Sequence, residues 1–263
     1  LGLAGIWHAK GSVNFVRDYQ FEYSRDNAEM HSVHGRQRKA ETMRRVLLEA
    51  RGGSLLDADV LNLGCSTGII DEYLAKHVRS MTGVDIDEPA VLLAESRKSA
   101  ANMQFRVGDA MALSFDDCSF DVVICSQVYE HVPDAERMMS EIRRVLRPGG
   151  LCYFAATNRW GVMEKHYHLP FLSWLPGKAA NAYLRLSGKG DVYYEKHLGY
   201  RGLLDLASAF EIEQWTGRII DDPERYAASY MFPGRLARTV ARSMHANLRP
   251  LFPGYIWLLR KRG

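Results

Sequence analysis

The sequence predicts a doubly wound α/β fold, in which helices cover both faces of a largely parallel sheet. From about residue 59 onward, short apolar runs alternate with longer segments whose apolar residues recur at helical spacing. The runs are nearly continuous, as expected of strands that are buried on both faces. Right-handed crossovers then place the carboxyl ends of these strands at one edge of the sheet, where ligands bind in such folds.

Each element is predicted from its own pattern. The expected strands cover residues 60–63, 81–84, 104–107, 120–125 and 151–155. The expected helices cover residues 69–78, 89–101 and 134–146, the last of which is stopped by Pro148-Gly149-Gly150. Glu211–Ile220 and Tyr255–Leu259 are predicted as two further strands. We therefore expect an N-terminal helical arm (1–50), a core (51–157), a cap insertion (158–200) and the end of the core sheet (201–263).

The composition is that of a globular protein, with 47% apolar residues, 25% charged residues and a net charge of +3. No apolar run approaches the roughly 20 residues of a bilayer-spanning helix. The four cysteines form no C-x-x-C pair, and three of them lie in or beside strand-like runs, which predicts reduced thiols and a cytoplasmic setting. The net charge is too small to indicate nucleic-acid binding.

The most informative segment is the turn Gly64–Gly68, which follows an apolar strand and opens a helix. Glycine lets the backbone approach a ligand closely, and the helix start presents unpaired N–H groups to it. About twenty residues later, Asp85 ends the second strand, where a carboxylate can accept hydrogen bonds from both hydroxyls of a ribose. A dinucleotide site would require G-x-G-x-x-G, but Ser66 and Ile69 occupy its second and third glycine positions.

Further segments follow the later strands of the expected sheet. Asp109, in Gly108-Asp109-Ala110, is placed to receive the amino group of an adenine. Ser126–His131 follows the fourth strand, beside the position where a methyl group would be transferred from S-adenosyl-L-methionine (SAM).

Together these segments resemble the class I SAM-dependent methyltransferases, particularly the small-molecule branch that includes the ubiquinone-biosynthesis O-methyltransferases. The matching motifs are LNLGCSTG (61–68), GVDID (83–87), GDA (108–110), FDVVICSQVYEHVPD (120–134) and LRPGG (146–150). The resemblance covers residues 55–157 and implies a Rossmann-like sheet of seven strands, six parallel and the last antiparallel. It also implies SAM as the cofactor, with these binding residues: Asn62, Gly64, Cys65, Ser66, Gly68, Asp85, Ile86, Asp109, Ala110, Ser126 and Gln127.

Two residues depart from this family. An acidic residue usually stands at the position of Asn62, and glycine at that of Ser66. Asn62 can donate a hydrogen bond but lacks the charge to pair with the ammonium group of the cofactor, so weaker binding is expected. A non-catalytic SAM-binding partner subunit is therefore an alternative.

Four residues are candidates for acid–base catalysis. His131 is the first candidate for the base, because methylation of oxygen requires removal of a proton. Glu130, His166 and His168 are the others, and structural roles in capping, packing or loops are the alternative for all four. In the ubiquinone O-methyltransferases, an E-x-x-E-H arrangement is linked to a divalent metal. Gln127 replaces its first glutamate, so no metal ligands are predicted.

The remaining segments suggest the acceptor. The cap contains the apolar stretch Leu169–Pro176, and no acidic residue follows Glu224. The basic face expected near the C-terminus comprises Arg235, Arg238, Arg242 and His245, and the apolar face comprises Leu236, Val240, Met244 and Leu248. We expect this helix and the cap to stand over one pocket for a lipid, isoprenoid or glycolipid-like acceptor, with peripheral membrane contact. Solvated or packed faces are the alternative.

Other acceptors fit the sequence less well. Methyl transfer to carbon or nitrogen stays open, but the chain lacks an N-P-P-Y-type segment and a Pro-Cys pair after the fourth strand. Nucleic-acid methylation is therefore not favoured.

Overall fold

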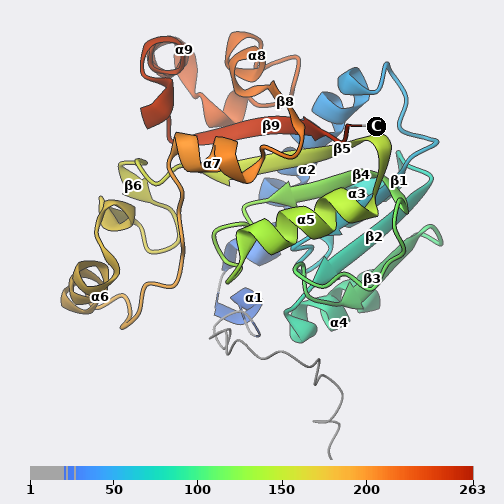
Figure 1. The fold of residues 1–263 in the computed structure, drawn as a ribbon, viewed down its shortest axis with the longest axis horizontal. Helices are drawn as coiled ribbons and strands as arrows, with labels where there is room; N and C mark the ends of the chain where they lie inside the picture. Colours follow the sequence, from blue (N-terminus) through green and yellow to red (C-terminus); the bar gives the residue numbers. More distant parts are fainter. Residues whose placement is uncertain (1–20, 22, 27, 263) are drawn as a thin grey trace, which may run out of the picture.

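The computed structural model describes residues 21, 23–26 and 28–262. Its centre is a seven-stranded sheet in the order β3-β2-β1-β4-β5-β9-β8 (Figure 1). The strands of this sheet are β1 (Asp59–Leu63), β2 (Ser80–Asp85), β3 (Met103–Val107), β4 (Phe120–Ser126), β5 (Leu146–Thr157), β8 (Glu211–Gln214) and β9 (Gly254–Arg260). The first five strands pair in parallel, and β9 is antiparallel to both β5 and β8. The predicted doubly wound sheet, with its last strand antiparallel, is confirmed.

Helices pack against both faces of this sheet (Figure 1). They are α1 (Tyr23–Asp26), α2 (Val33–Ala50), α3 (Ile69–Ala75), α4 (Glu88–Arg97), α5 (Ala135–Val145), α6 (Gly177–Leu186), α7 (Tyr200–Leu206), α8 (Thr216–Asp221) and α9 (Gly234–Asn247). Side chains of α2, α3 and α4 enter one buried apolar cluster, and those of α5 and α7 enter the other. Within β4, Val122 and Ile124 join the first cluster, whereas Val123 and Cys125 join the second. Both faces of the strand are thus buried, which explains its continuous apolar run.

The prediction of a strand over Glu211–Ile220 is wrong in its second half. Pairing with β9 ends at Gln214, and the chain continues as α8. The hydroxyl of Thr216 accepts a hydrogen bond from the backbone N–H of Ile256 at 2.9 Å, in the place of a further strand carbonyl. Ile219 and Ile220 are then buried in the two separate clusters, so apolar content alone did not distinguish the helix from a strand.

Residues 158–200 form a small layered unit beyond one end of the sheet (Figure 1). It contains the short pair β6 (Met163–Glu164) and β7 (Leu169–Pro170), a 3₁₀ turn at Leu172–Trp174 and α6. Leu169, Leu172, Ala180 and Leu184 give it an apolar cluster of its own. Among the described residues, no helix is both long and apolar enough to span a bilayer.

A network around Glu41 holds α2 against α3. The carboxylate accepts hydrogen bonds from Arg44 and Arg45, each at 2.6 Å from Nε, and from the hydroxyl of Tyr73 at 2.8 Å. The hydrogen bond from Arg44 is the largest of the effects that lower the pKa of Glu41 to about 2.

Glu41→Gln is expected to lower the free energy of unfolding at pH 7 by about 1 to 2 kcal/mol, since partly exposed arginines are screened by solvent. Because the folded-state pKa is below the usual 4.5, this stabilisation is present above pH 4.5 and is lost as the pH falls towards 2. Urea unfolding of both proteins across this range measures the difference. The exposed Glu211→Gln serves as the control, and a Glu41→Gln effect that is constant with pH would contradict the assignment.

A second prediction concerns the glycine that starts α3. Gly68 has a φ of +73°, and a Cβ there would lie 2.7 Å from Cζ of Phe105 and 2.8 Å from Cβ of Ala94. Gly68→Ala is expected to cost about 2 to 4 kcal/mol of stability through backbone strain and overpacking. Gly52 has a φ of +74°, and a Cβ there would have no atom within 4 Å, so Gly52→Ala isolates the backbone strain, about 1 kcal/mol. If chemical denaturation showed that Gly68→Ala and Gly52→Ala lose the same free energy of unfolding, overpacking at Gly68 would contribute nothing.

Candidate functional site

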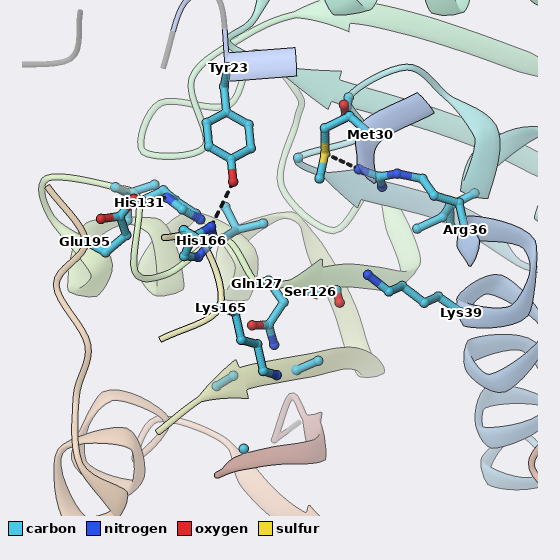
Figure 2. Close-up of a pocket in the computed structure, with 18 of the residues that line it drawn as sticks. Tyr23, Met30, Arg36, Lys39, Ser126, Gln127, His131, Lys165, His166 and Glu195 are labelled. Carbon is cyan, nitrogen blue, oxygen red and sulfur yellow. Dashed lines mark hydrogen bonds and ion pairs between the residues drawn. The ribbon is translucent and has the colours of Figure 1, made fainter. Parts of the chain in front are cut away.

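A cavity of about 1330 Å³ lies where the parallel strands end (Figure 2). Its strand-end lining includes Asn62 near the end of β1 and Gly64 just after it, Asp85 at the end of β2, Asp109 after β3 and Gln127 after β4. Pockets for drug-sized ligands usually measure about 300 to 1,000 Å³. This cavity is therefore large enough for two ligands side by side.

The turn between β1 and α3 forms one wall of the cavity. The backbone N–H of Gly64 donates to the carbonyl of Val84 at 2.9 Å, which ties the turn to β2. Gly64 has a φ of +71°, and a Cβ there would lie 2.8 Å from a methyl carbon of Val128. Ser66 also has a positive φ, +50°, a conformation that favours glycine. The serine is thus accommodated at a backbone position where the related family usually has glycine.

Asp85 is fixed by the backbone on both sides of its carboxylate. Oδ2 accepts a hydrogen bond from the N–H of Ser66 at 2.7 Å, and Oδ1 accepts one from the N–H of Asp87 at 3.0 Å. Burial raises the pKa of Asp85, and the two backbone hydrogen bonds oppose that rise. A carboxylate oxygen has two lone pairs, so each oxygen can still accept another hydrogen bond from a ligand.

Asn62 is paired with an acidic residue whose burial the sequence did not reveal. Its Nδ2 donates to Oδ2 of Asp71 at 2.8 Å. Asp71 is fully buried, burial raises its pKa to about 7, and its Oδ1 accepts no hydrogen bond from the described residues. A carboxylate therefore lies directly behind Asn62, although Asp71 itself does not line the cavity.

Helix α2 and the segment before it contribute residues that sequence reasoning missed. Arg36 and Lys39 reach into the cavity from α2, and Tyr23 and Met30 from the preceding segment (Figure 2). Nη2 of Arg36 donates to the sulfur of Met30, while its Nε has no hydrogen-bond partner among the described residues. A basic helix is typical of a solvated surface, so the sequence held no signal that one arginine would be buried.

The opposite end of the cavity is rich in histidine. His131, His166 and His168 line it, and Glu130 is buried nearby without lining it. The ring centroids of His131 and His166 lie 4.7 Å apart, and the hydroxyl of Tyr23 is 2.9 Å from Nδ1 of His166. Burial lowers the pKa of His131 to about 3, and the two neighbouring imidazoles of His166 and His197 contribute to that decrease. Burial raises the pKa of Glu130 to about 7.

Most of the predicted cofactor-binding residues lie together. Apart from Cys65 and Gly68, they line the cavity: Asn62, Gly64, Ser66, Asp85, Ile86, Asp109, Ala110, Ser126 and Gln127. Cys65 is instead buried in the apolar core, and Gly68 packs against Phe105 and Ala94. The side chain of Gln127 accepts a hydrogen bond from the hydroxyl of Thr157, which orients it within the wall.

The cap lines the cavity, but α9 does not. Lys165, Tyr167, Tyr194 and Glu195 are among the lining residues from the cap. The chain contributes again just before α9, at Met231 and Phe232, and just after it, at Phe252–Ile256. The expectation that the basic helix stands over the pocket is therefore wrong for the helix itself.

The predicted faces of α9 are also only partly realised. Of its four predicted apolar residues, only Met244 packs against the core, whereas Leu236 and Val240 are exposed. Arg238 donates to backbone carbonyls of α8, and Nε of Arg242 lies 2.7 Å from a carboxylate oxygen of Asp221. Packing on α8 thus uses part of the basic face.

The central part of the chain is similar in sequence to known methyltransferases. Residues 61–154 match the methyltransferase domain family. Over 102 residues the chain is 35% identical to the ubiquinone biosynthesis O-methyltransferase of Coxiella burnetii. This alignment covers 38% of this chain and 44% of that protein. Over 109 residues it is 34% identical to the protein of the same name from Pseudomonas fluorescens, with coverages of 40% and 47%. The chain thus spans less than half the length of these curated relatives.

Solved structures extend the likeness to most of the fold. A protein from Pyrococcus horikoshii aligns with a TM-score of 0.58 and 20% identity, over 91% of this chain and 98% of that one. A SAM-dependent methyltransferase from Methanosarcina mazei aligns with a TM-score of 0.51 and 22% identity, over 79% and 93%. At such identities the likeness shows the fold alone. The comparisons confirm the resemblance to the SAM-dependent methyltransferases, and residues 61–154 of the chain carry the match to the methyltransferase domain family.

Proposed function

We propose that this chain transfers a methyl group from SAM to an oxygen atom of a small or amphiphilic acceptor. The observation that carries the proposal is the single cavity that joins the strand-end residues to the histidine-rich end. Apart from Asn62 and Ser66, the first group has the residue types that bind SAM in the related family. The second lies beneath the cap, where an acceptor would enter. The names of the curated relatives favour oxygen as the methylated atom.

The lining residues fit the cofactor that the domain implies. Gly64 gives the turn its left-handed conformation close beside Val128, and Asp85 has lone pairs available for the two ribose hydroxyls. Asp109 and Ala110 follow β3, where they would frame the adenine. SAM, when bound, supplies an electrophilic methyl group, and the chain supplies the position and orientation of the acceptor.

Two charged residues would compensate for the absence of an acid at position 62. The amide of Asn62 stands between the cavity and the buried carboxylate of Asp71. The guanidinium of Arg36, which lines the cavity, is suited to the carboxylate of the methionine moiety. We therefore propose that the methionine end is bound by Arg36 and Asn62, and that Asp71 orients the amide of Asn62 from behind.

The acceptor is proposed to be amphiphilic because of an exposed apolar surface on the cap. This surface, the cap patch, consists of Trp160, Val162, Met163, Phe171 and Trp174, each between 38% and 54% exposed. The ring of Trp174 contacts those of Trp160 and Phe171, at centroid distances of 5.5 and 4.9 Å. Exposed tryptophans that adjoin apolar side chains are typical of membrane-interface contacts.

The cap patch adjoins the cavity along the chain. Only Glu164 separates Val162 and Met163 from the loop 165–168, which lines the histidine-rich end. A cap that touches a lipid surface would place this loop where an amphiphilic acceptor could leave the membrane. The three buried cysteine thiols, Cys65, Cys125 and Cys152, support a reducing, cytoplasmic setting on the inner side of such a membrane.

Calorimetric titration with S-adenosylhomocysteine tests the cofactor site. Asp85→Asn, which keeps the shape of the side chain, is expected to weaken binding at least tenfold, because it replaces a charge-assisted acceptor of the ribose hydroxyls. The exposed Asp116→Asn is the matched control and should bind as the wild type does. Equal affinity of all three proteins would remove Asp85 from the site, and no binding by folded wild type would refute the cofactor assignment.

Flotation with vesicles that contain anionic lipid tests the membrane contact. The double variant Val162→Asp/Met163→Asp is expected to lose most of the vesicle-bound fraction, because it places two carboxylates in the cap patch. Leu186→Asp is the control, since Leu186 is 88% exposed at the end of α6 but lies outside the patch. Wild type that stays with the unbound fraction would refute this part of the proposal without affecting the cofactor site.

A further inference from the structure

Six titratable side chains lie together at the histidine-rich end of the molecule. They come from three segments that are distant in sequence: Glu130 and His131 after β4, Glu164 and His166 at β6, and Glu195 and His197 before α7. Figure 2 shows His131, His166 and Glu195 side by side at one wall of the cavity. Metal-ligating atoms of Glu164, His166 and His197 all lie within 4.8 Å of one another.

The carboxylate of Glu164 is oriented by the backbone. Its Oε2 accepts hydrogen bonds from the N–H groups of His166 and Tyr167, both at 2.8 Å. Its Oε1 lies 3.5 Å from Nε2 of His197 and 4.0 Å from Nε2 of His166. These distances exceed those of good hydrogen bonds. They approach the separation of about 3.4 Å between two ligand atoms that share a tetrahedral ion at about 2.1 Å.

The site is buried, and several of its candidate ligand atoms have no hydrogen-bond partner among the described residues. The side chains of Glu164 and His197 are only 1% and 2% exposed. Among the described residues, neither Oε1 of Glu164 nor either ring nitrogen of His197 makes a hydrogen bond. Glu130, beside them, is fully buried, and neither of its carboxylate oxygens has such a partner. Buried polar groups and charges are costly when they are not paired, and a bound cation would supply the partner.

Tyr23 is placed to orient His166 as a metal ligand. The hydroxyl of Tyr23 lies 2.9 Å from its Nδ1, so in one tautomer Nδ1–H donates to Tyr23 and the lone pair of Nε2 faces Glu164. Metal-binding histidines commonly donate their other ring N–H to an oxygen in this way.

We propose that Glu164, His166 and His197 bind one divalent first-row transition-metal ion. Two imidazoles and one carboxylate favour zinc, iron or manganese over Mg²⁺, which prefers oxygen ligands. None of the three residues belongs to the segment 127–131, in which the family arrangement places its metal ligands. Glu130 and His131 form a neighbouring group that shares His166. Metal binding at Glu164 does not depend on the proposed methyl transfer.

Titration of the purified, chelator-stripped full chain with Co²⁺ tests the site, because cobalt bound in such a site absorbs in the visible range. We expect one equivalent per chain, with Zn²⁺ displacing the cobalt. His197→Gln and Glu164→Gln should each weaken binding at least tenfold. Added Zn²⁺ should raise the melting temperature of the wild type but not that of either variant. The melting transition of each variant also shows that the variant folds.

His168→Asn is the matched control. His168 lies in the same loop and lines the same cavity, but it is outside the cluster, and asparagine tolerates its φ of +51°. Its cobalt affinity should equal that of the wild type. Glu130→Gln should stay within about threefold, because Glu130 lies in the neighbouring group. The proposal is overturned if folded wild type binds no metal, if His197→Gln binds as tightly as wild type, or if Glu130→Gln alone abolishes binding.

Discussion

The parallel pairing of β1 with both β2 and β4 is the constraint on which the cavity depends. Leu63 is in register with Val84 on one side and with Cys125 on the other. All three strands therefore end at the same level, and the residues that follow each of them meet at one edge. The hydrogen bond from the N–H of Ser66 to Asp85 then joins two of these strand ends directly. The turn, the position of the Asp85 carboxylate and the wall after β4 all follow from this alignment.

The cavity has two halves of different origin. The half formed by the strand ends lies within residues 61–154, the region that matches the methyltransferase domain. The other half also includes His131 from that region, but the rest of it comes from α2, the cap and the segments around α9, which lie outside the matched residues. A fold hosts many functions, and the site decides among them. The choice of acceptor therefore depends on the part of the chain for which the domain match gives no information.

Buried ionisable groups are concentrated at the two ends of this cavity, some in its lining and others directly behind it. At one end Asp71 and Arg36 lie close to the turn, and at the other Glu130, Glu164 and Glu195 lie among three histidines. Burying so many ionisable groups costs stability unless they are paired. Their presence is more readily explained by ligands that complete the pairing than by packing, since apolar residues of the same size would pack without that cost.

The sequence by itself determined the alternation of strands and helices in the core, the turn at Gly64 and the position of Asp85 at the end of a strand. These depend on local chemistry: continuous apolar runs, glycine in a left-handed conformation, and a carboxylate at a strand end. Only the tertiary structure decided the rest. It ended β8 at Gln214 because Thr216 replaced a strand partner.

It also brought His197 to Glu164, and Arg36 to the cavity. These contacts join residues that are more than 25 positions apart, so neither periodicity nor spacing along the chain records them. Whether a basic or polar residue is buried depends on which segments the fold packs around it, and that information is absent from any single stretch of sequence.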